Sequence, residues 1–416
     1  MTSSRTNSMG SVGDDVRGWD TPERQALREM VTTFTEKEIA PHLSQWEDAN
    51  EVPRELHKKA ADAGLIGVAF PEEVGGQGGN LIDSTIVTES ILEAGGSTGL
   101  IAALFTHGIA LPHIVASGTR PDASAEAREL VDRYVRPTLA GDMIGSLGVT
   151  EPGAGSDVAN IRTKAVRDPS TGSGQAADWI VNGAKTFITS GVRADFVTTA
   201  VRTGGEGYPG ISLLVIDKNT PGFTVARPLK KMGWHCSDTA ELSFDNVRVP
   251  AANIVGEVDG GFVLIMQQFV NERLGLAVQA YSTAQRALDL SVAYARDRET
   301  FGRPLIQRQV IRHKLVDMHR KTAAARALTR LAIEKAVASA VSIDGTPGPI
   351  LEAVLAKNQS VEACEWVVSE AVQIHGGMGY MRESEIDRHY RDARILGIGG
   401  GATEVLNDLA AKLLGF

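Results

Sequence analysis

The spacing of apolar residues along the chain changes twice, and the two changes divide it into three parts. Up to about residue 145 the spacing is helical, starting where Thr21-Pro22-Glu23 supplies a hydroxyl cap, a proline in the first turn and an early acid. Glycine pairs at 75–76, 78–79 and 95–96 interrupt this part. We expect a disordered tail over residues 1–18 and an all-helical domain over residues 19–145.

Residues 146–255 instead carry short runs rich in β-branched and aromatic residues, separated by turn residues. The clearest runs are Phe196–Val201, Ile211–Ile216 and Glu241–Val249. Asn182-Gly183 stands between two further runs and predicts a hairpin turn there. Because no helical run separates these strands, the pattern predicts an antiparallel β-sandwich or barrel.

Helical spacing returns after Gly260-Gly261 and continues to the end of the chain. Long runs rich in alanine and leucine cover Phe262–Arg296, Gln309–Val341 and Ile350–Ile374, and the loop Gly345–Pro349 separates the last two. Runs of this length that pack side by side predict a four-helix bundle over residues 256–416. The expected fold class is therefore α+β and multidomain.

Composition and charge narrow the function classes. The chain has 416 residues, of which 43% are hydrophobic and 22% charged, as expected for a soluble protein of two or three domains. Its net charge of -9 argues against nucleic acid as a main partner. Two cysteines form no disulfide or zinc pattern, no apolar run is long enough to span a membrane, and Met1–Arg17 resembles no leader. A cytoplasmic location without membrane attachment is expected.

One segment is unusually dense in glycine and hydroxyl residues. Gly148–Asp157 has three glycines, a proline, Thr150 and Ser156 directly after an apolar run. Glycines allow backbone N–H groups to approach a ligand closely, and the hydroxyls add hydrogen bonds. Taken alone, the segment is more easily explained as an ordinary tight loop.

Glu272 interrupts an apolar face of the helix predicted after Gly260. Residues of that face recur at intervals of three and four: Phe262, Ile265, Phe269, Leu276 and Ala280. A carboxylate buried there would have a raised pKa, as a general base working near neutrality needs. The alternative is that Glu272 lies at the edge of the face, paired with Arg273 or with solvent, and the periodicity alone slightly favours it.

Several motifs occur in a fixed order along the chain. They are Phe70–Glu73, Gly148–Asp157, Lys231–Thr239, Arg298–Gly302, Gln373–Tyr380 and Tyr390–Ala393. In this order the series resembles the acyl-CoA dehydrogenase family of flavoenzymes, from about residue 20 onward. The resemblance implies FAD as cofactor, an acyl-CoA substrate of fatty acid β-oxidation, an electron-transfer flavoprotein as electron acceptor, and a homo-oligomer, expected to be a tetramer.

The resemblance also implies a glutamate that removes the α proton of a thioester, at one of two places. Many members carry it before a Gly-Thr pair near the C-terminus, where this chain has Gly400. Members resembling the isovaleryl and long-chain enzymes carry it first in a Glu-Arg-Leu, which here is Glu272-Arg273-Leu274. Glu272 is therefore the predicted base, while Gly400 keeps the N–H that meets the thioester oxygen. The nearest rival is Glu404, whose alternative role is that of an acid at a helix N-terminus.

The remaining motif residues are implied as contacts to cofactor and substrate. Val149, Thr150, Ser156, Phe187 and Thr189 match residues around the flavin, and Arg298, Phe301 and Gln309 match residues at the pyrophosphate and adenine. Gln373 and Gly377 match a segment that reaches the FAD of a neighbouring subunit. Arg273 has a family counterpart that contacts the CoA moiety, Gly399 is expected beside the thioester, and the far end of the acyl pocket is expected to be lined by Ile101, Ala102 and Phe105. Each could instead be an ordinary surface or core residue, but together they are in register.

Some positions depart from the family pattern, and two other functions stay open. Leu147 and Phe187 stand where many members have Tyr and Trp, His235 replaces a frequent Arg, and Ala402 replaces a Thr. The sequence does not decide whether oxygen reaches the reduced flavin, as in an oxidase or monooxygenase on the same fold. A nucleic-acid-associated member is the third possibility, and the acidic balance and Glu272 argue against it.

Overall fold

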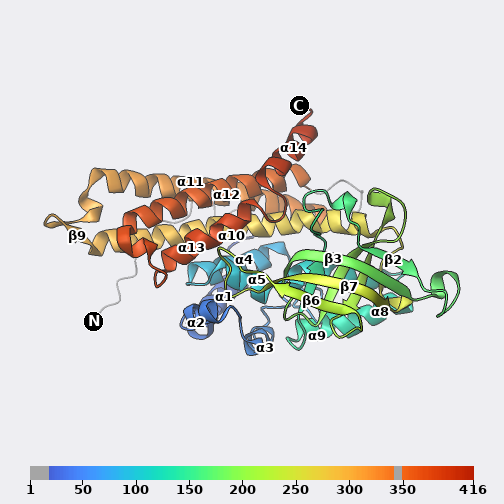
Figure 1. The fold of residues 1–416 in the computed structure, drawn as a ribbon. Helices are drawn as coiled ribbons and strands as arrows, with labels where there is room; N and C mark the ends of the chain where they lie inside the picture. Colours follow the sequence, from blue (N-terminus) through green and yellow to red (C-terminus); the bar gives the residue numbers. More distant parts are fainter. Residues whose placement is uncertain (1–17, 342–348) are drawn as a thin grey trace.

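The computed structural model describes residues 18–341 and 349–416, so most of the predicted tail and of the predicted loop Gly345–Pro349 lies outside the described residues. The three parts expected from the sequence are present as a helical N-terminal part, a β-sheet and a set of long C-terminal helices (Figure 1). The predicted fold class is confirmed.

The N-terminal part begins with the predicted helix. α1 covers Pro22–Phe34, and the Thr21 hydroxyl caps it by accepting a hydrogen bond from the Arg24 N–H at 3.3 Å. A π-helical turn, Thr35–Ile39, continues it to Ala40. The helices that follow are α2 (Leu43–Ala49), α3 (Arg54–Asp62), α4 (Leu81–Glu93), α5 (Thr98–Leu104), α6 (His107–Ala110), α7 (Pro112–Gly118), α8 (Ala125–Leu130) and α9 (Arg136–Leu139).

The middle part is a single eight-stranded sheet with the order β6-β7-β3-β2-β4-β5-β8, with β1 paired to β4. Its strands are β1 (Gly145–Gly148), β2 (Lys164–Arg167), β3 (Trp179–Thr189), β4 (Phe196–Arg202), β5 (Ile211–Asp217), β6 (Phe223–Pro228), β7 (Thr239–Val249) and β8 (Ile254–Val255). The three clearest predicted runs became β4, β5 and β7. Most pairs are antiparallel as expected, but β1 and β2 each run parallel to β4.

The prediction of a hairpin turn at Asn182-Gly183 is wrong. β3 runs without a turn from Trp179 to Thr189, and Gly183 lies at a shift in its register with β7. Gly183 has a φ of 150°, and a Cβ there would lie 2.5 Å from the Thr163 hydroxyl oxygen. The glycine therefore permits a β-bulge and a close approach of the neighbouring chain, which short-range sequence signals do not distinguish from a turn.

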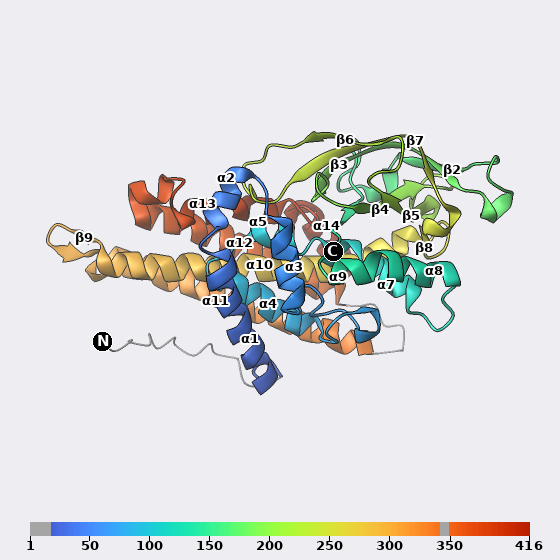
Figure 2. The same cartoon turned by 90° about the horizontal axis from the view of Figure 1, so that it is seen from below.

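The C-terminal part is built on three long helices, as the apolar spacing predicts. They are α10 (Gly261–Asp297), α11 (Gln309–Val341) and α12 (Ile350–His375), followed by α13 (Glu385–Ala393) and α14 (Thr403–Leu414). A two-stranded hairpin, β9 (Glu299–Thr300) and β10 (Arg303–Pro304), joins α10 to α11. Two views place this hairpin at the end of the long helices remote from the sheet (Figures 1 and 2).

None of the described helices is both long and apolar enough to cross a lipid bilayer.

Buried polar contacts join the three parts and so fix the site between them. The Tyr281 hydroxyl of α10 donates to the Glu89 carboxylate of α4 at 2.7 Å. The Trp234 indole N–H donates to the Thr98 hydroxyl of α5 at 2.8 Å, and its backbone N–H donates to the Asp392 carboxylate of α13 at 2.6 Å. The loop before β7 is thus attached to both helical parts.

Candidate active site

Glu272 and Gly400 lie side by side, although they are far apart in the sequence. Glu272 is on α10 with intermediate exposure, and Gly400 is in the loop before α14. A Cβ on Gly400 would lie 3.6 Å from Oε1 of Glu272 and 2.4 Å from Cδ1 of Leu276. The two positions at which the resemblance places the base are therefore adjacent in the fold, and in this chain the carboxylate reaches them from α10.

Burial controls the protonation of Glu272. Desolvation raises the pKa of this carboxyl, while the positive charges of Arg273 and Lys357 act in the opposite direction. Arg273 does not pair with it, because its guanidinium lies over the Phe269 ring, 5.4 Å from the centroid, and its Nε donates to the Gly400 carbonyl at 3.4 Å. The sequence left open that Glu272 pairs with Arg273 at the edge of the apolar face, and the structure does not show this pair.

The loop around Gly400 owes its shape to its glycines. Gly400 and Gly401 have φ of 63° and 99°, in the left-handed region that favours glycine. Lys357 of α12 donates to the Gly401 carbonyl at 2.6 Å. Sequence reasoning missed Lys357, although a lysine directly after the apolar run Ala353–Ala356 is the same kind of signal as Glu272 in its own apolar face. The rival carboxylate, Glu404, is exposed in the first turn of α14.

The glycine-rich segment after β1 is anchored from behind by a buried ion pair. Lys185 of β3 contacts Glu151 at 2.8 Å and also donates to the Val149 carbonyl at 3.0 Å. The Glu151 carboxylate accepts from the backbone N–H groups of Arg162 and Thr163 at 2.6 and 2.9 Å. Val149 is buried, whereas Ser156 is exposed and free to face a ligand.

Strand β3 presents an aromatic side chain beside this segment. Thr186 donates its N–H to the Thr150 carbonyl at 2.9 Å, and its own carbonyl accepts the Thr150 hydroxyl. Phe187, the next residue, is 70% exposed and has a φ of 59°. A left-handed backbone is uncommon for a bulky residue, and such strain clusters at binding sites. Thr189 lies two residues further along β3 with intermediate exposure.

The other predicted FAD contacts lie at the remote end of α10. Arg298 follows Glu272 by about seven turns, which at 1.5 Å per residue separates the two Cα atoms by about 39 Å. Tyr294 of α10 stacks on His375 of α12, with ring centroids 4.4 Å apart, and so brings the end of α12 to the same place. The five predicted residues at this end are all exposed: Arg298, Phe301, Gln309, Gln373 and Gly377.

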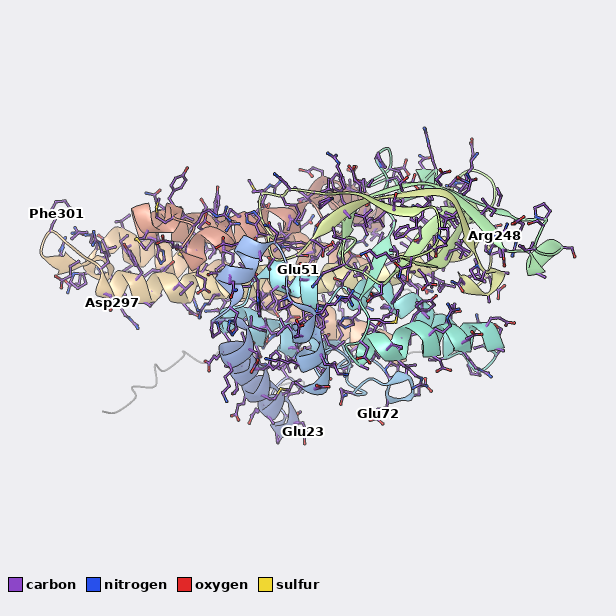
Figure 3. All side chains as sticks on the ribbon, turned by 60° about the horizontal axis from the view of Figure 1, so that its bottom comes forward. Glu23, Glu51, Glu72, Arg248, Asp297 and Phe301 are labelled. Atoms are coloured by element: carbon purple, nitrogen blue, oxygen red, sulfur yellow. The ribbon has the colours of Figure 1, made fainter. Side chains whose placement is uncertain are left out.

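Phe301 marks this remote end most clearly. It is 97% exposed at the tip of the β9–β10 hairpin and has a φ of 50°. In Figure 3 it lies on the opposite side of the molecule from Arg248 of β7. The predicted FAD residues therefore form two groups, which one chain does not bring together.

Comparisons with known proteins show the family of this chain. Sequence models of the N-terminal, middle and C-terminal domains of acyl-CoA dehydrogenase match residues 21–139, 146–247 and 259–415. The mitochondrial long-chain specific acyl-CoA dehydrogenase of Mus musculus is 36% identical over 94% of this chain and 86% of its own. This chain belongs to the acyl-CoA dehydrogenase family.

Two further family members extend the likeness over nearly all of both chains. A probable acyl-CoA dehydrogenase of Bacillus subtilis is 36% identical over 95% of this chain and 98% of its own. The crystal structure of a probable acyl-CoA dehydrogenase from Mycobacterium abscessus is 63% identical, covers 95% of this chain and 100% of its own, and superposes with a TM-score of 0.89.

Members of the acyl-CoA dehydrogenase family are FAD-dependent, and the residues present here fit such a group. A flat isoalloxazine ring suits the exposed Phe187 and the glycine-rich segment with Ser156, while an adenine suits an exposed ring such as Phe301. Arg298 adds a planar, permanently charged donor suited to pyrophosphate.

Three of the residues predicted for the acyl pocket of this acyl-CoA dehydrogenase lie on α5 or at its end. Ile101 is buried, whereas Ala102 and Phe105 have intermediate exposure, as does Gly399 in the loop beside Gly400. Gln268, one turn before Glu272, donates to the Gly108 carbonyl at 3.1 Å. This contact brings the face of α10 that carries Glu272 toward the segment that follows α5.

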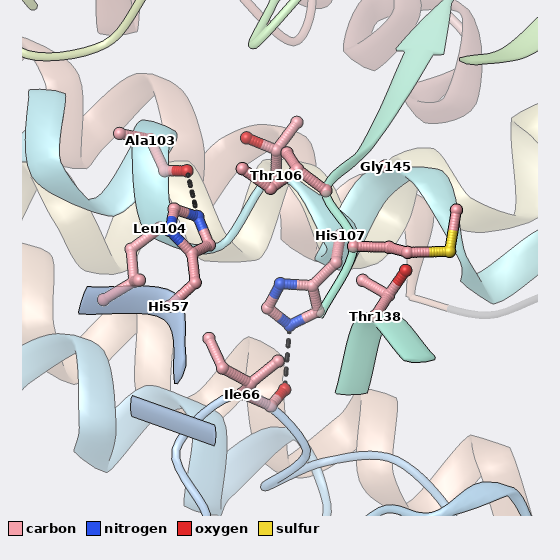
Figure 4. Close-up of a pocket in the computed structure, with 10 residues that line it drawn as sticks. His57, Ile66, Ala103, Leu104, Thr106, His107, Thr138 and Gly145 are labelled. Carbon is pink, nitrogen blue, oxygen red and sulfur yellow. Dashed lines mark hydrogen bonds between the residues drawn. The ribbon is translucent and has the colours of Figure 1, made fainter. Parts of the chain in front are cut away.

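A small cavity lies next to α5, and the two histidine rings that line it each meet a backbone carbonyl (Figure 4). His57 meets the Ala103 carbonyl at 3.3 Å, and His107 meets the Ile66 carbonyl at 2.8 Å. Desolvation lowers their pKa values to about 3 and about 4, so both rings are neutral. None of the residues predicted for the site lines this cavity, which belongs to the packing of the domain.

His235, which departs from the family pattern, has a defined role in the loop before β7. Its Nε2 meets the Lys231 carbonyl at 3.1 Å, and its Nδ1 meets nitrogens of Arg382 and Arg391 at 2.9 and 3.3 Å. Because guanidinium groups only donate, Nδ1 is the acceptor and Nε2 carries the hydrogen. His235 therefore attaches this loop to the segment around α13.

Proposed function

We propose that this acyl-CoA dehydrogenase catalyses the FAD-dependent α,β-dehydrogenation of an acyl-CoA thioester to the trans-2-enoyl-CoA, with Glu272 as the base. The observation that supports this is the Glu272 carboxylate beside Gly400, where a Cβ would lie 3.6 Å from Oε1. In the proposal the carboxylate takes the place of the base that many family members carry in the loop.

Glu272 takes the proton from carbon two of the acyl chain. A raised pKa makes the carboxylate a stronger base than a solvated one, and accepting the proton removes a charge from a poorly solvated position. Among the described residues, none donates a hydrogen bond to the Glu272 carboxylate, so its oxygens are available to the substrate.

Negative charge develops on the thioester oxygen as the proton leaves. In the proposal the backbone N–H of Gly400 donates to that oxygen, which a preorganised backbone donor can do without any side chain. Arg273 is proposed to contact the CoA moiety, since its charge is not used by an ion pair with Glu272. Ile101, Ala102, Phe105 and Gly399 are proposed to line the acyl pocket.

Bound FAD supplies the acceptor for the hydride that leaves carbon three. Val149, Thr150, Ser156, Phe187 and Thr189 are proposed to hold the flavin next to Glu272. The residues proposed for the pyrophosphate and adenine come from the remote end of a second copy of the chain: Arg298, Phe301, Gln309, Gln373 and Gly377.

This division requires a homo-oligomer, for which we propose a tetramer. The support is the separation of about 39 Å along α10 together with the exposure of all five residues at the remote end. An electron-transfer flavoprotein is the proposed electron acceptor, as the family suggests. Light scattering of the purified protein is expected to give a multiple of the mass of one chain, and a monomeric mass with bound FAD would contradict the shared site.

One experiment tests the proposed reaction. The purified protein is expected to be yellow and to bleach without oxygen when the right member of a panel of acyl-CoA thioesters is added, which also identifies the substrate class. Readmitting air then separates a dehydrogenase, whose colour returns slowly, from an oxidase. A protein that is colourless, or that no thioester bleaches, would contradict the proposal and favour a non-metabolic role.

A further inference from the structure

Lys357 is an unusual residue for its position in α12. Its side chain is fully buried, with an exposed fraction of 0%, which is rare for lysine because a buried ammonium loses its hydration. The one hydrogen bond it makes among the described residues is to the Gly401 carbonyl, at 2.6 Å. A costly buried charge therefore stands directly behind the loop that carries Gly400.

That loop needs outside support, because three successive glycines give it no side chain of its own to pack. Its carbonyls are held by donors from two helices. Arg273 of α10 reaches the Gly400 carbonyl at 3.4 Å, and Asn358 of α12 reaches the Thr403 carbonyl at 3.1 Å. Lys357 makes the shortest of these three contacts, and the carbonyl it holds, that of Gly401, lies between the other two along the chain.

The Lys357 charge also acts on the base. It opposes the effect of burial on the Glu272 carboxyl, and Glu272 in turn opposes the effect of burial on Lys357, whose pKa is lowered to about 8. Arg273 and Glu365 are the other charged groups that act on Lys357. The two groups make no direct ion pair, so the ammonium influences Glu272 without occupying its oxygens.

We propose that Lys357 is a positioning residue for the dehydrogenation, which holds the Gly399–Gly401 loop so that the Gly400 N–H faces the thioester oxygen and which places a positive charge at the loop that Glu272 adjoins. This inference rests on the proposed function of Glu272. A lysine with only a structural role would support the fold but would leave the pH dependence of the base unchanged.

The test uses FAD-loaded, full-length protein with three substitutions. Lys357→Met removes the charge and the hydrogen bond, Lys357→Arg keeps the charge but changes the reach, and Lys335→Met is the control. Lys335 is a lysine of α11 whose ion pair with Glu352, at 2.6 Å, lies at the surface. Flavin reduction by a bleaching acyl-CoA is followed without oxygen across the pH range, together with FAD content and melting temperature.

Lys357→Met is expected to shift the acid limb of flavin reduction upward by about one pH unit, the smaller end of the effect of a nearby opposite charge. It is also expected to slow reduction at the plateau by about tenfold, less than the loss of a whole oxyanion donor. Lys357→Arg should leave the acid limb in place while still slowing the plateau, and Lys335→Met should change neither. An unmoved acid limb in a folded, yellow Lys357→Met protein would overturn the inference.

A second measurement does not depend on turnover. The carboxyl band of Glu272 is titrated by infrared difference spectroscopy, with Glu272→Gln to assign it, and its midpoint should move upward in Lys357→Met. If Lys357→Met does not fold, the comparison of Lys357→Arg with the wild type decides, since an arginine variant with a shifted midpoint or an unchanged plateau would contradict the proposal. Failure of the proposed function itself is distinct, because then no thioester bleaches the wild type.

Discussion

The two ends of α10 are built in opposite ways. At one end Glu272 meets Gly400 within a single chain, and the surrounding loop is held by Lys357 and Arg273. At the other end Phe301 is 97% exposed on a hairpin that extends from the long helices, with its backbone in the left-handed region (Figure 3). The groups at the first end are held by contacts within the chain, whereas the predicted FAD residues at the second end are exposed.

This difference separates the chemistry from the assembly. Changes at the Glu272 end should alter proton removal while the cofactor stays bound, and changes at the Phe301 end should alter retention of the cofactor while the base stays intact. The following predictions use that separation, beginning with the largest effect.

Glu272→Gln is expected to lower the rate of flavin reduction by at least about 100-fold, the typical loss for a general base. FAD content and acyl-CoA binding should be unchanged, because glutamine has nearly the same shape. Anaerobic stopped-flow absorbance measures the rate, and Glu404→Gln serves as the matched control. A slow Glu404→Gln protein beside a normal Glu272→Gln protein would transfer the role to Glu404.

Arg298→Ala at the remote end is expected to weaken FAD binding by about 10- to 100-fold, the value of a charge-assisted hydrogen bond of about 1.5–3 kcal/mol. Added FAD should restore the rate of reduction, since Glu272 is untouched. Equilibrium dialysis measures the affinity, with Arg296→Ala, an exposed arginine at the same end of α10, as the control. A loss that excess FAD does not restore would contradict the separation of the two ends.

Gly400→Ala and Gly399→Ala form a matched pair in the loop. At Gly400 an added Cβ would lie 2.4 Å from Cδ1 of Leu276. The alanine would also have to keep the left-handed backbone of Gly400, which costs about 1–2 kcal/mol. At Gly399 the nearest atom, the Ile395 carbonyl oxygen, is 3.5 Å away in ordinary contact. Thermal denaturation should therefore show a lower stability for Gly400→Ala alone. Equal stabilities would mean that the loop has another shape.

Gly275→Ala is expected to stabilise the protein slightly, by up to about 1 kcal/mol, because glycine is unfavourable inside a helix. A Cβ at Gly275 would meet no atom within 4 Å. Gly261→Ala in the same helix is the contrasting variant, since its Cβ would lie 2.7 Å from the Ser212 carbonyl carbon. Melting temperatures that fall for both would show that the space beside Gly275 is needed.

The fold could be predicted from the sequence wherever the pattern was long and local. The three long helices follow from sustained apolar spacing, and β4, β5 and β7 follow from runs of β-branched and aromatic residues. The hairpin prediction at Asn182-Gly183 failed because turns and bulges favour the same residues, and only the pairing with the partner strand decides between them. The parallel pairing of β1 with β4 depends likewise on contacts between distant segments.

The candidate site shows the same limit. Glu272 could be singled out as a carboxylate in an apolar face, but periodicity alone slightly favoured an edge position, and its proximity to Gly400 depends on how α10 meets the C-terminal loop. Lys357 was missed for the same reason, since its partner is a backbone carbonyl in another segment. Arg298 and Phe301 could be identified as a motif, and their distance from Glu272 follows from the length of α10, most of which the helical run Phe262–Arg296 predicted.

The central claim is that Glu272 removes the proton from carbon two, and hydrogen exchange tests it most directly. An acyl-CoA that lacks hydrogen on carbon three cannot transfer hydride, so its incubation with the FAD-loaded protein in deuterium oxide isolates the deprotonation. Mass spectrometry is expected to find deuterium on carbon two with the wild type and at least about 100-fold slower incorporation with Glu272→Gln. Incorporation at the wild-type rate by Glu272→Gln would contradict the assignment.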